Sequence, residues 1–136
     1  MAKFEFDLGP VQKMLEELGD IDEVAPRMLR RVGPIAKAAI QGRLKKHSRT
    51  GGLVKSVRPG KPKTGKTGGW YMIVGFRGYD KNGHPNDVKA AGLEYGNSHQ
   101  QPEPFLDAAA KDCEAEVVDA MQAEYNLWLK EKGMVK

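Results

Sequence analysis

The sequence predicts one α+β domain, in which a small, mostly antiparallel sheet packs against a long N-terminal helix and a long C-terminal helix. Two observations support this prediction. Apolar residues recur at helical spacing in two long segments near the ends of the chain. The segment between them is rich in glycine, proline and strand-forming runs. Because 136 residues suffice for one core but not for two, we expect residues 1–136 to form a single domain.

Two helices are predicted in the first third of the chain. Within the N-terminal segment 1–21, we expect a short helix over residues 10–18, because Pro10 suits a first helical position and the apolar residues after it share one face. A longer helix should run from about Asp22 to about Lys46. Its apolar stripe consists of Ile21, Val24, Met28, Val32, Ile35, Ala39, Ile40 and Leu44.

A glycine–proline pair interrupts the second of these helices. Proline removes one backbone donor and its ring clashes with the preceding helical turn. We therefore expect a kink or a break at Gly33-Pro34.

The middle of the chain predicts strands. WYMIVGF, over Trp70–Phe76, is aromatic and β-branched and is the best candidate, and LVKSVR, over Leu53–Arg58, alternates like a half-exposed strand. Between them, residues 59–69 are expected to form a flexible basic loop. After a hairpin tip at Lys81-Asn82-Gly83, a third strand is predicted over Val88–Tyr95.

The last predicted helix runs roughly from Pro104 to Lys132. Gly133 is a suitable stop signal. The apolar stripe of this helix consists of Leu106, Ala109, Cys113, Val117, Ala120, Met121, Tyr125 and Trp128.

The net charge of +4 hides a strong segregation along the chain. Residues 1–23 hold two bases against seven acids, residues 24–79 hold 14 bases and no acid, and residues 80–136 hold six bases against eleven acids. A basic middle between acidic ends fits two kinds of partner. One is a polyanion such as DNA; the other is acidic surface on neighbouring copies of the same chain.

The stretch GKPKTGKTGG, over residues 60–69, matches the phosphate-binding pattern G-x-x-x-x-G-K-[ST]. A working phosphate loop needs a helix that begins at its Lys-[ST] end, because the free amides of that helix bind the phosphates. Here two glycines and a strand signature follow Thr67, and no apolar strand ends in a metal-binding aspartate. We therefore interpret the stretch as a basic loop between two strands.

Other catalytic or metal chemistry finds little support in the sequence. His47, His84, His99 and Cys113 are scattered, without the spacing of a metal site. Cys113 lies on the apolar stripe of the last helix, which favours core packing over a role as a nucleophile. We expect no catalytic, cofactor-binding or metal site, no cofactor and no enzymatic activity.

No segment of the chain predicts export or membrane insertion. MAKFEFDLGP lacks the apolar core of a signal peptide, and no run approaches the roughly 18 apolar residues of a membrane span. We expect the protein to stay in the cytoplasm in which it is made.

Six cations crowd into 18 residues of the central segment, and a tryptophan and a tyrosine follow them. The cations are Arg49, Lys55, Arg58, Lys61, Lys63 and Lys66. They are candidates for contacts with DNA or with another subunit. One hypothesis is therefore a non-specific DNA-binding accessory protein that acts through the basic segment 27–77. No signature of a sequence-specific reader is visible.

Two further motifs point to a family. The first is TGGLVKSV, over residues 50–57, of the form T-G-x-L-x-x-S-[IV]; the second is Glu94-Tyr95-Gly96, followed by PEPFL over residues 102–106 and an alanine-rich helix. In this order, the motifs resemble those of the head–tail joining (neck or tail-completion) proteins of long-tailed bacteriophages, over roughly residues 22–130. The matching positions are Thr50, Gly51, Leu53, Ser56, Glu94, Tyr95, Gly96, Pro104 and Phe105.

The resemblance implies a virion structural protein that assembles as a ring, expected to hold six copies, at the junction of head and tail. Its partners would be further copies of itself, the head-closure (stopper) proteins and the tail-terminator or tail tube proteins, with DNA passing through the ring. The protein would be assembled in the host cytoplasm and end in the neck of the virion.

The motif residues themselves have structural interpretations. Thr50-Gly51 can end the long helix, and Leu53 with Val57 should face the core of a regular strand. Gly96 would permit a tight turn after the third strand. Pro104 pre-sets the last helix, and Phe105 with Leu106 should anchor its first turn.

Overall fold

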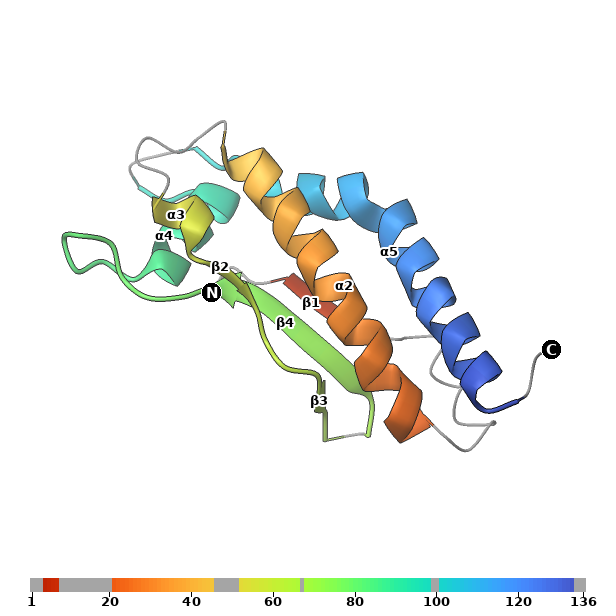
Figure 1. The fold of residues 1–136 in the computed structure, drawn as a ribbon. Helices are drawn as coiled ribbons and strands as arrows, with labels where there is room; N and C mark the ends of the chain where they lie inside the picture. The colour runs from red at the N-terminus through yellow and green to blue at the C-terminus, as the bar shows by residue number, and fades with distance from the viewer. Residues whose placement is uncertain (1–3, 8–20, 46–51, 67, 99–100, 134–136) are drawn as a thin grey trace.

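The computed structural model describes residues 4–7, 21–45, 52–66, 68–98 and 101–133 (Figure 1). It is an α+β fold, as predicted from the sequence. The elements in chain order are β1 (Phe4–Asp7), α2 (Ile21–Leu44), α3 (Gly52–Lys55), β2 (Val57–Pro59), β3 (Lys63–Thr64), β4 (Trp70–Phe76), α4 (Asn86–Tyr95) and α5 (Phe105–Glu131). The predicted helix over residues 10–18 lies outside the described residues.

The sheet is antiparallel and is organised around β4. β1 pairs with one side of β4, and β2 and β3 pair with the other. Along β4, Met72, Val74 and Phe76 are buried, whereas the residues between them are only partly covered. Because side chains alternate across a strand, β4 presents one face to the core and the other outward.

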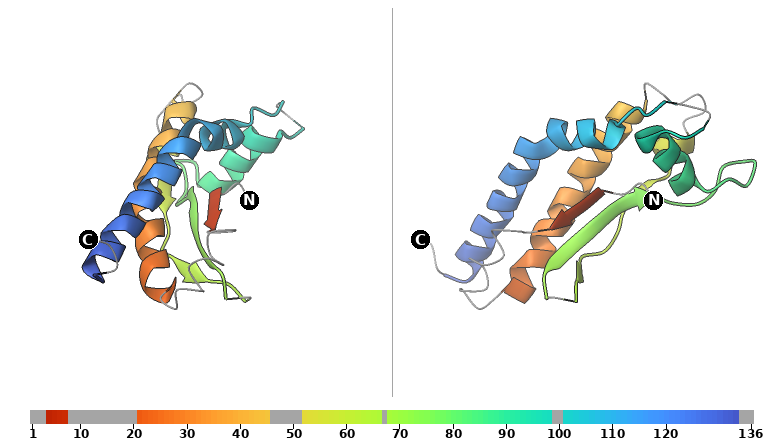
Figure 2. Two further views of the ribbon diagram at one scale, coloured as in Figure 1. Left: turned by 90° about the vertical axis from the view of Figure 1, so that its right-hand side faces the viewer. Right: turned by 180° about the vertical axis from the view of Figure 1, so that it is seen from behind.

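Both long helices lie on the same side of this sheet (Figure 2). α2 packs directly on β2 and β4, and α5 packs along α2. The core between these layers comprises Val24, Ala25, Met28, Leu29, Ala36, Ile40, Leu44, Val57, Met72, Val74, Phe76, Ala90, Phe105, Leu106, Ala109 and Trp128. The apolar stripes predicted for the two helices therefore face each other and the sheet.

Of the kink or break expected at Gly33-Pro34, the break does not occur, because α2 is a single helix with both Pro26 and Pro34 inside it. A Cβ atom on Gly33 would lie 3.0 Å from the Cβ of Pro59. Gly33 thus lets α2 approach β2 closely. Packing of this helix against the sheet and α5 outweighs the cost of about 3 kcal/mol that an interior proline imposes.

One predicted strand is wrong, and a second is wrong in its first half. Residues 88–95 belong to helix α4, whose buried residues Asn86, Ala90 and Glu94 recur every four positions. Alanine, leucine and glutamate are good helix formers, and Val88 is the only β-branched residue there. The predicted strand over Leu53–Arg58 is replaced in its first half by the short helix α3.

The turn at α3 is closed by Ser56. Its backbone N–H donates to Gly52 O at 3.1 Å, and its side-chain hydroxyl donates to Leu53 O at 2.7 Å. The extended conformation begins only at Val57, which is buried in the core as expected. Leu53 packs against the core from α3.

The predicted loop over residues 59–69 contains the end of β2 and the short strand β3, whereas three other predictions match the structure closely. The strand Trp70–Phe76 has the predicted bounds, and the predicted helix from Pro104 to Lys132 is α5. A turn occupies Lys81-Asn82-Gly83, with Gly83 at a φ of 81° and its N–H donating to Asp80 O. The strand β1 was not predicted, and it adds the edge of the sheet opposite β2.

Candidate interaction surface

The stretch that resembles a phosphate loop is a bulged β-hairpin. Pro59 is paired with Val74 and Lys63 with Tyr71, so three residues of the first strand lie opposite two of β4. This count defines a β-bulge. At the bulge, Gly60 donates its N–H to Ile73 O at 2.7 Å.

Backbone amides at the tip of the hairpin donate hydrogen bonds to carbonyl oxygens within the tip. Gly65 N–H donates to Gly69 O at 2.7 Å, and Gly68 N–H donates to Gly65 O at 3.0 Å. Gly68 has a φ of 87°, a conformation that favours glycine. The chain then enters β4 at Trp70, as predicted. The amides at the tip therefore close the hairpin, whereas the amides of a phosphate loop bind the nucleotide.

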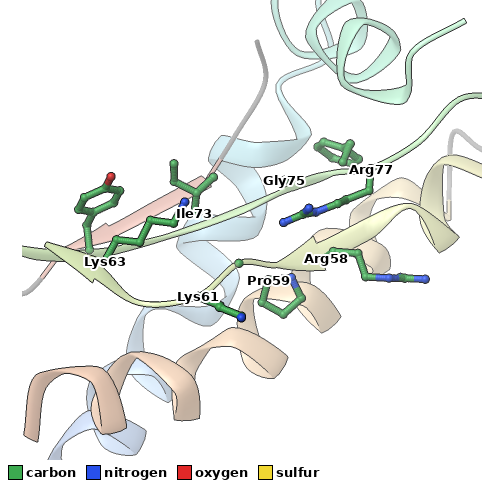
Figure 3. Close-up of a pocket in the computed structure, with 10 residues that line it drawn as sticks. Arg58, Pro59, Lys61, Lys63, Ile73, Gly75 and Arg77 are labelled. Carbon is green, nitrogen blue, oxygen red and sulfur yellow. The ribbon is translucent and has the colours of Figure 1, made fainter. Parts of the chain in front are cut away.

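An open groove lies on the outer face of this hairpin (Figure 3). It has a volume of about 490 Å³. Its floor is formed by Tyr71, Ile73 and Gly75 of β4, and its charged groups are the side chains of Arg58, Lys61, Lys63 and Arg77. We call these seven residues the cationic groove.

The four cations come from both strands of the hairpin. Arg58 is paired with Gly75 and Lys63 with Tyr71, so each points to the same face as its partner. In Figure 3, Lys63 extends towards Ile73 and Arg77 extends back towards β2. Arg58 also donates to its neighbours' backbone oxygens, to Lys55 O at 2.6 Å and to Val57 O at 2.9 Å, which restrains its side chain.

The groove has no acid in its lining, and within the described part of the chain none of its cations forms an ion pair. By contrast, three arginines of α2 are paired with acids of α5. Arg27 donates to Glu124 at 3.0 Å and to Glu131 at 2.7 Å, and Arg31 also donates to Glu124 at 2.9 Å. The third, Arg43, donates to Asp112 at 2.6 Å. Three arginines of the basic segment 24–79 are thus neutralised by acids of α5, whereas the cations of the groove form no ion pair with a described residue.

These ion pairs lower the pKa of two carboxyl groups. Burial alone would raise the pKa of Glu124, but hydrogen bonds from Arg31 and Arg27 outweigh it, and the pKa is lowered from its ordinary value of 4.5. The hydrogen bond from Arg27 likewise lowers the pKa of Glu131. A lowered pKa in the folded state stabilises the fold above pH 4.5, and this contribution is lost as the pH falls through the folded-state pKa.

We therefore predict that the destabilisation caused by Arg27→Met shrinks in acid. At neutral pH the variant should have a lower free energy of unfolding than the wild type, and the difference should decrease as the pH falls below 4.5. Urea unfolding followed by circular dichroism across a pH series measures it. Arg30→Met is the matched control, because Arg30 is exposed and unpaired within the described residues. A difference for Arg27→Met that is constant with pH would contradict the prediction.

Acids also remain on the solvent side of α5. Glu114 and Asp119 are exposed and form no ion pair with any described residue. Between them on the same helical face lie Ala115 and Val118, and Val118 is 59% exposed. We call Glu114, Ala115, Val118 and Asp119 the acidic face of α5.

The fold joins the two parts of the second motif. Glu94, at the end of α4, is buried, and its carboxylate accepts the Leu106 backbone N–H at 2.8 Å. Glu103 N–H in turn donates to Leu93 O at 2.7 Å. Glu94 therefore caps the first turn of α5, whose N-terminal amides otherwise lack helical partners.

The other residues of this motif are placed around that cap. Gly96 ends helix α4 at a φ of 78°, so it follows a helix where a strand was expected. Pro104 occupies the N-cap position of α5, and Phe105 and Leu106 are buried as predicted, with Phe105 packed edge-on against Phe76. Tyr95 is 67% exposed.

The remaining predicted residues separate into two groups. Arg49, Thr50 and Gly51 lie outside the described residues. Lys55 on α3 and Lys66 at the hairpin tip are exposed and do not line the groove, whereas Arg58, Lys61 and Lys63 do.

Arg77 was missed as a groove residue. It follows β4 at a position two residues beyond Gly75, so strand alternation places it on the outer face. The alternation of side chains along the predicted strand could therefore have identified Arg77 from the sequence.

Among the described residues, no three histidine, cysteine or acidic side chains are grouped as a metal site would require. No helix in the described ranges has the length and apolar character needed to cross a membrane. No protein-family model, no curated protein and no solved structure matches this chain.

Proposed function

We propose that this protein is a virion structural component of a tailed phage, a neck or tail-completion protein that forms a ring at the head–tail junction. The ring, of six copies, connects the head-closure proteins to the tail-terminator or tail tube proteins and surrounds the channel for DNA. Its role is mechanical and depends on its interfaces. It is assembled in the host cytoplasm and remains in the virion.

The observation that carries this proposal is the separation of unlike charge onto two surfaces of one small subunit. The cationic groove lies on the outer face of the sheet, and the acidic face lies on α5, which packs on the other side of that sheet (Figure 2). A subunit with two different complementary surfaces forms heterologous contacts, which close into rings when the rotation permits. The order of the two sequence motifs supports the location in the neck.

The buried cap that joins the two parts of the second motif is also consistent with a structural role. Glu94 and the PEPFL segment serve to fix α4 against the start of α5. A ring subunit of this kind needs fixed angles between its elements, because small errors would prevent closure.

Electron microscopy with purified long phage tails tests the proposal. We expect negatively stained images to show rings in the protein sample at high concentration, and additional density at the head-proximal end of tails mixed with the protein. Tails alone are the control. Absence of both rings and capped tails would overturn the proposed function.

A second candidate function is non-specific DNA binding through segment 27–77, which the unpaired cations of the groove favour. Three arginines of that segment, Arg27, Arg31 and Arg43, are engaged by α5. The cations that stay exposed are those of the hairpin together with Arg30, Lys45 and Lys55. Tight binding of DNA by a dispersed monomer, with a steep salt dependence in a gel-shift series, would favour this candidate.

A further inference from the structure

We infer that the cationic groove is the seat for the acidic face of α5 of a neighbouring copy of this chain. The inference deepens the proposed ring and rests on it, since it names the two surfaces that meet. It is drawn from the charge, exposure and shape of the two surfaces.

The first support is that the groove cations form no ion pair with an acid of the described residues. Lys61 and Lys63 are exposed, and no acid lies in the lining of the groove. Several like charges held close together repel one another, and a partner of opposite sign relieves that repulsion. No acid of the lining offsets these charges, and the described acid on this face of the sheet is Glu5 of β1, which is paired with Ile73.

The second support is the way α5 distributes its acids. On the side facing α2, Glu124 and Asp112 are already bound by arginines. On the solvent side, Glu114 and Asp119 remain unpaired within the described residues. Two of the acids that α5 can offer to another molecule thus flank Val118, and the exposed Glu116 lies on another side of the helix.

The third support is the apolar component of each surface. The groove floor contains Tyr71 and Ile73, both partly exposed, and the acidic face has Val118 at its centre. Contact between Val118 and this floor would remove apolar area from water while the carboxylates reach the cations at the rim. The phosphate backbone of duplex DNA would satisfy the cations but leave the apolar floor without a partner. The observations therefore favour the protein surface.

The two surfaces belong to different layers of the molecule (Figure 2). One copy can consequently contact one neighbour through its groove and another through its α5 at the same time. After each contact, the assembly still has a free groove at one end and a free acidic face at the other. Such a contact repeats until the ring closes.

Charge reversal on each surface tests the inference. The groove variant is Lys61→Glu/Lys63→Glu, and the helix variant is Glu114→Lys/Asp119→Lys. All four residues are exposed and make no ion pair with a described residue, so the variants should fold, which thermal melting by circular dichroism verifies. The matched control is Lys45→Glu/Lys81→Glu, which reverses two exposed cations outside the groove.

Self-association is measured by sedimentation velocity over a concentration series, and ring formation on tails by electron microscopy. Each variant alone should associate at least about tenfold more weakly than the wild type, because like charges then face each other. Mixing the two variants should restore association, because every contact in an alternating assembly again joins opposite charges. The control should behave as the wild type.

Several results would overturn the inference. If the groove variant assembles and caps tails like the wild type, the groove is not the contact, although the ring function stands. If the variants fail and their mixture is not restored, the two surfaces do not meet. If the groove variant loses binding to a fluorescent DNA duplex but assembles normally, the groove is a nucleic-acid site. If the wild type itself neither forms rings nor caps tails, the proposed function fails as well.

Discussion

Replacing Trp128 with alanine is expected to lower the free energy of unfolding by about 3–5 kcal/mol, the largest effect of any single truncation proposed for this chain. Trp128 has no exposed surface and is the largest of the fully buried side chains. It lies near the end of α5, stacked on Tyr125 with ring centroids 6.0 Å apart. Its removal would leave a cavity between the helices that surrounding side chains fill only in part.

The position of Trp128 adds to this effect. Glu131 and Lys132 of the same turn pair with Arg27 and Glu23 of α2, so Trp128 anchors the segment where the two long helices are tied together. Loss of the indole is therefore expected to loosen these pairs as well. Because they are exposed, their share of the loss should be small.

Chemical unfolding followed by circular dichroism at neutral pH measures the effect without relying on tryptophan fluorescence. Leu127→Ala is the matched control, since Leu127 is the adjacent residue of α5 and is 47% exposed. We expect the control to lose less than about 1 kcal/mol. A loss of that size for Trp128→Ala would contradict the assignment of Trp128 to the core.

The Glu94→Ala variant is expected to lose about 1.5–3 kcal/mol, the range for a hydrogen bond to a charged group. The carboxylate is buried and bound to the Leu106 N–H at 2.8 Å, at the positive end of a 27-residue helix. Alanine would leave that amide without its acceptor in a buried position. The same change would free the end of α4 from the start of α5.

The Glu94→Gln variant separates the loss of the hydrogen-bond acceptor from the loss of the negative charge. Glutamine retains an oxygen that can accept the Leu106 N–H, so it should lose only about half as much as alanine. Glu116→Ala, at an exposed position of α5, should stay within about 0.5 kcal/mol of the wild type. The cap is refuted if Glu94→Ala is no more destabilised than Glu116→Ala in the same unfolding measurement.

The elements that the sequence predicted correctly are those with a strong local pattern. Trp70–Val74 is a run of aromatic, apolar and β-branched residues, and the apolar stripe of α5 extends over about six turns, from Leu106 to Trp128. The failures are the segments where the local preference is weak. Residues 88–95 contain good helix formers but also Gly92 and the strand formers Val88 and Tyr95, and burial of Ala90 and Glu94 against the rest of the fold stabilises the helix.

The candidate surface was predicted in part. A basic hairpin was evident from composition, and three of its cations, Arg58, Lys61 and Lys63, do share the groove. Strand alternation beyond the predicted strand places Arg77 on the outer face, but which cations lie beside it there depends on the register of the strands. The pairing of Arg27, Arg31 and Arg43 with α5 likewise joins residues about 70 to 100 positions apart, which no local pattern reveals.

By itself, the sequence determined the class of the fold, the two long helices, the central strand and the segregation of charge, because these follow from periodicity and composition along the chain. Only the tertiary structure decided which charges remain available to a partner. Ion pairing depends on distance in space, and the fold brings the arginines of α2 to the acids of α5 while it holds the hairpin cations on the opposite side of the sheet. The same reason applies to Glu94, which becomes a buried helix cap because the fold brings the end of α4 to the start of α5.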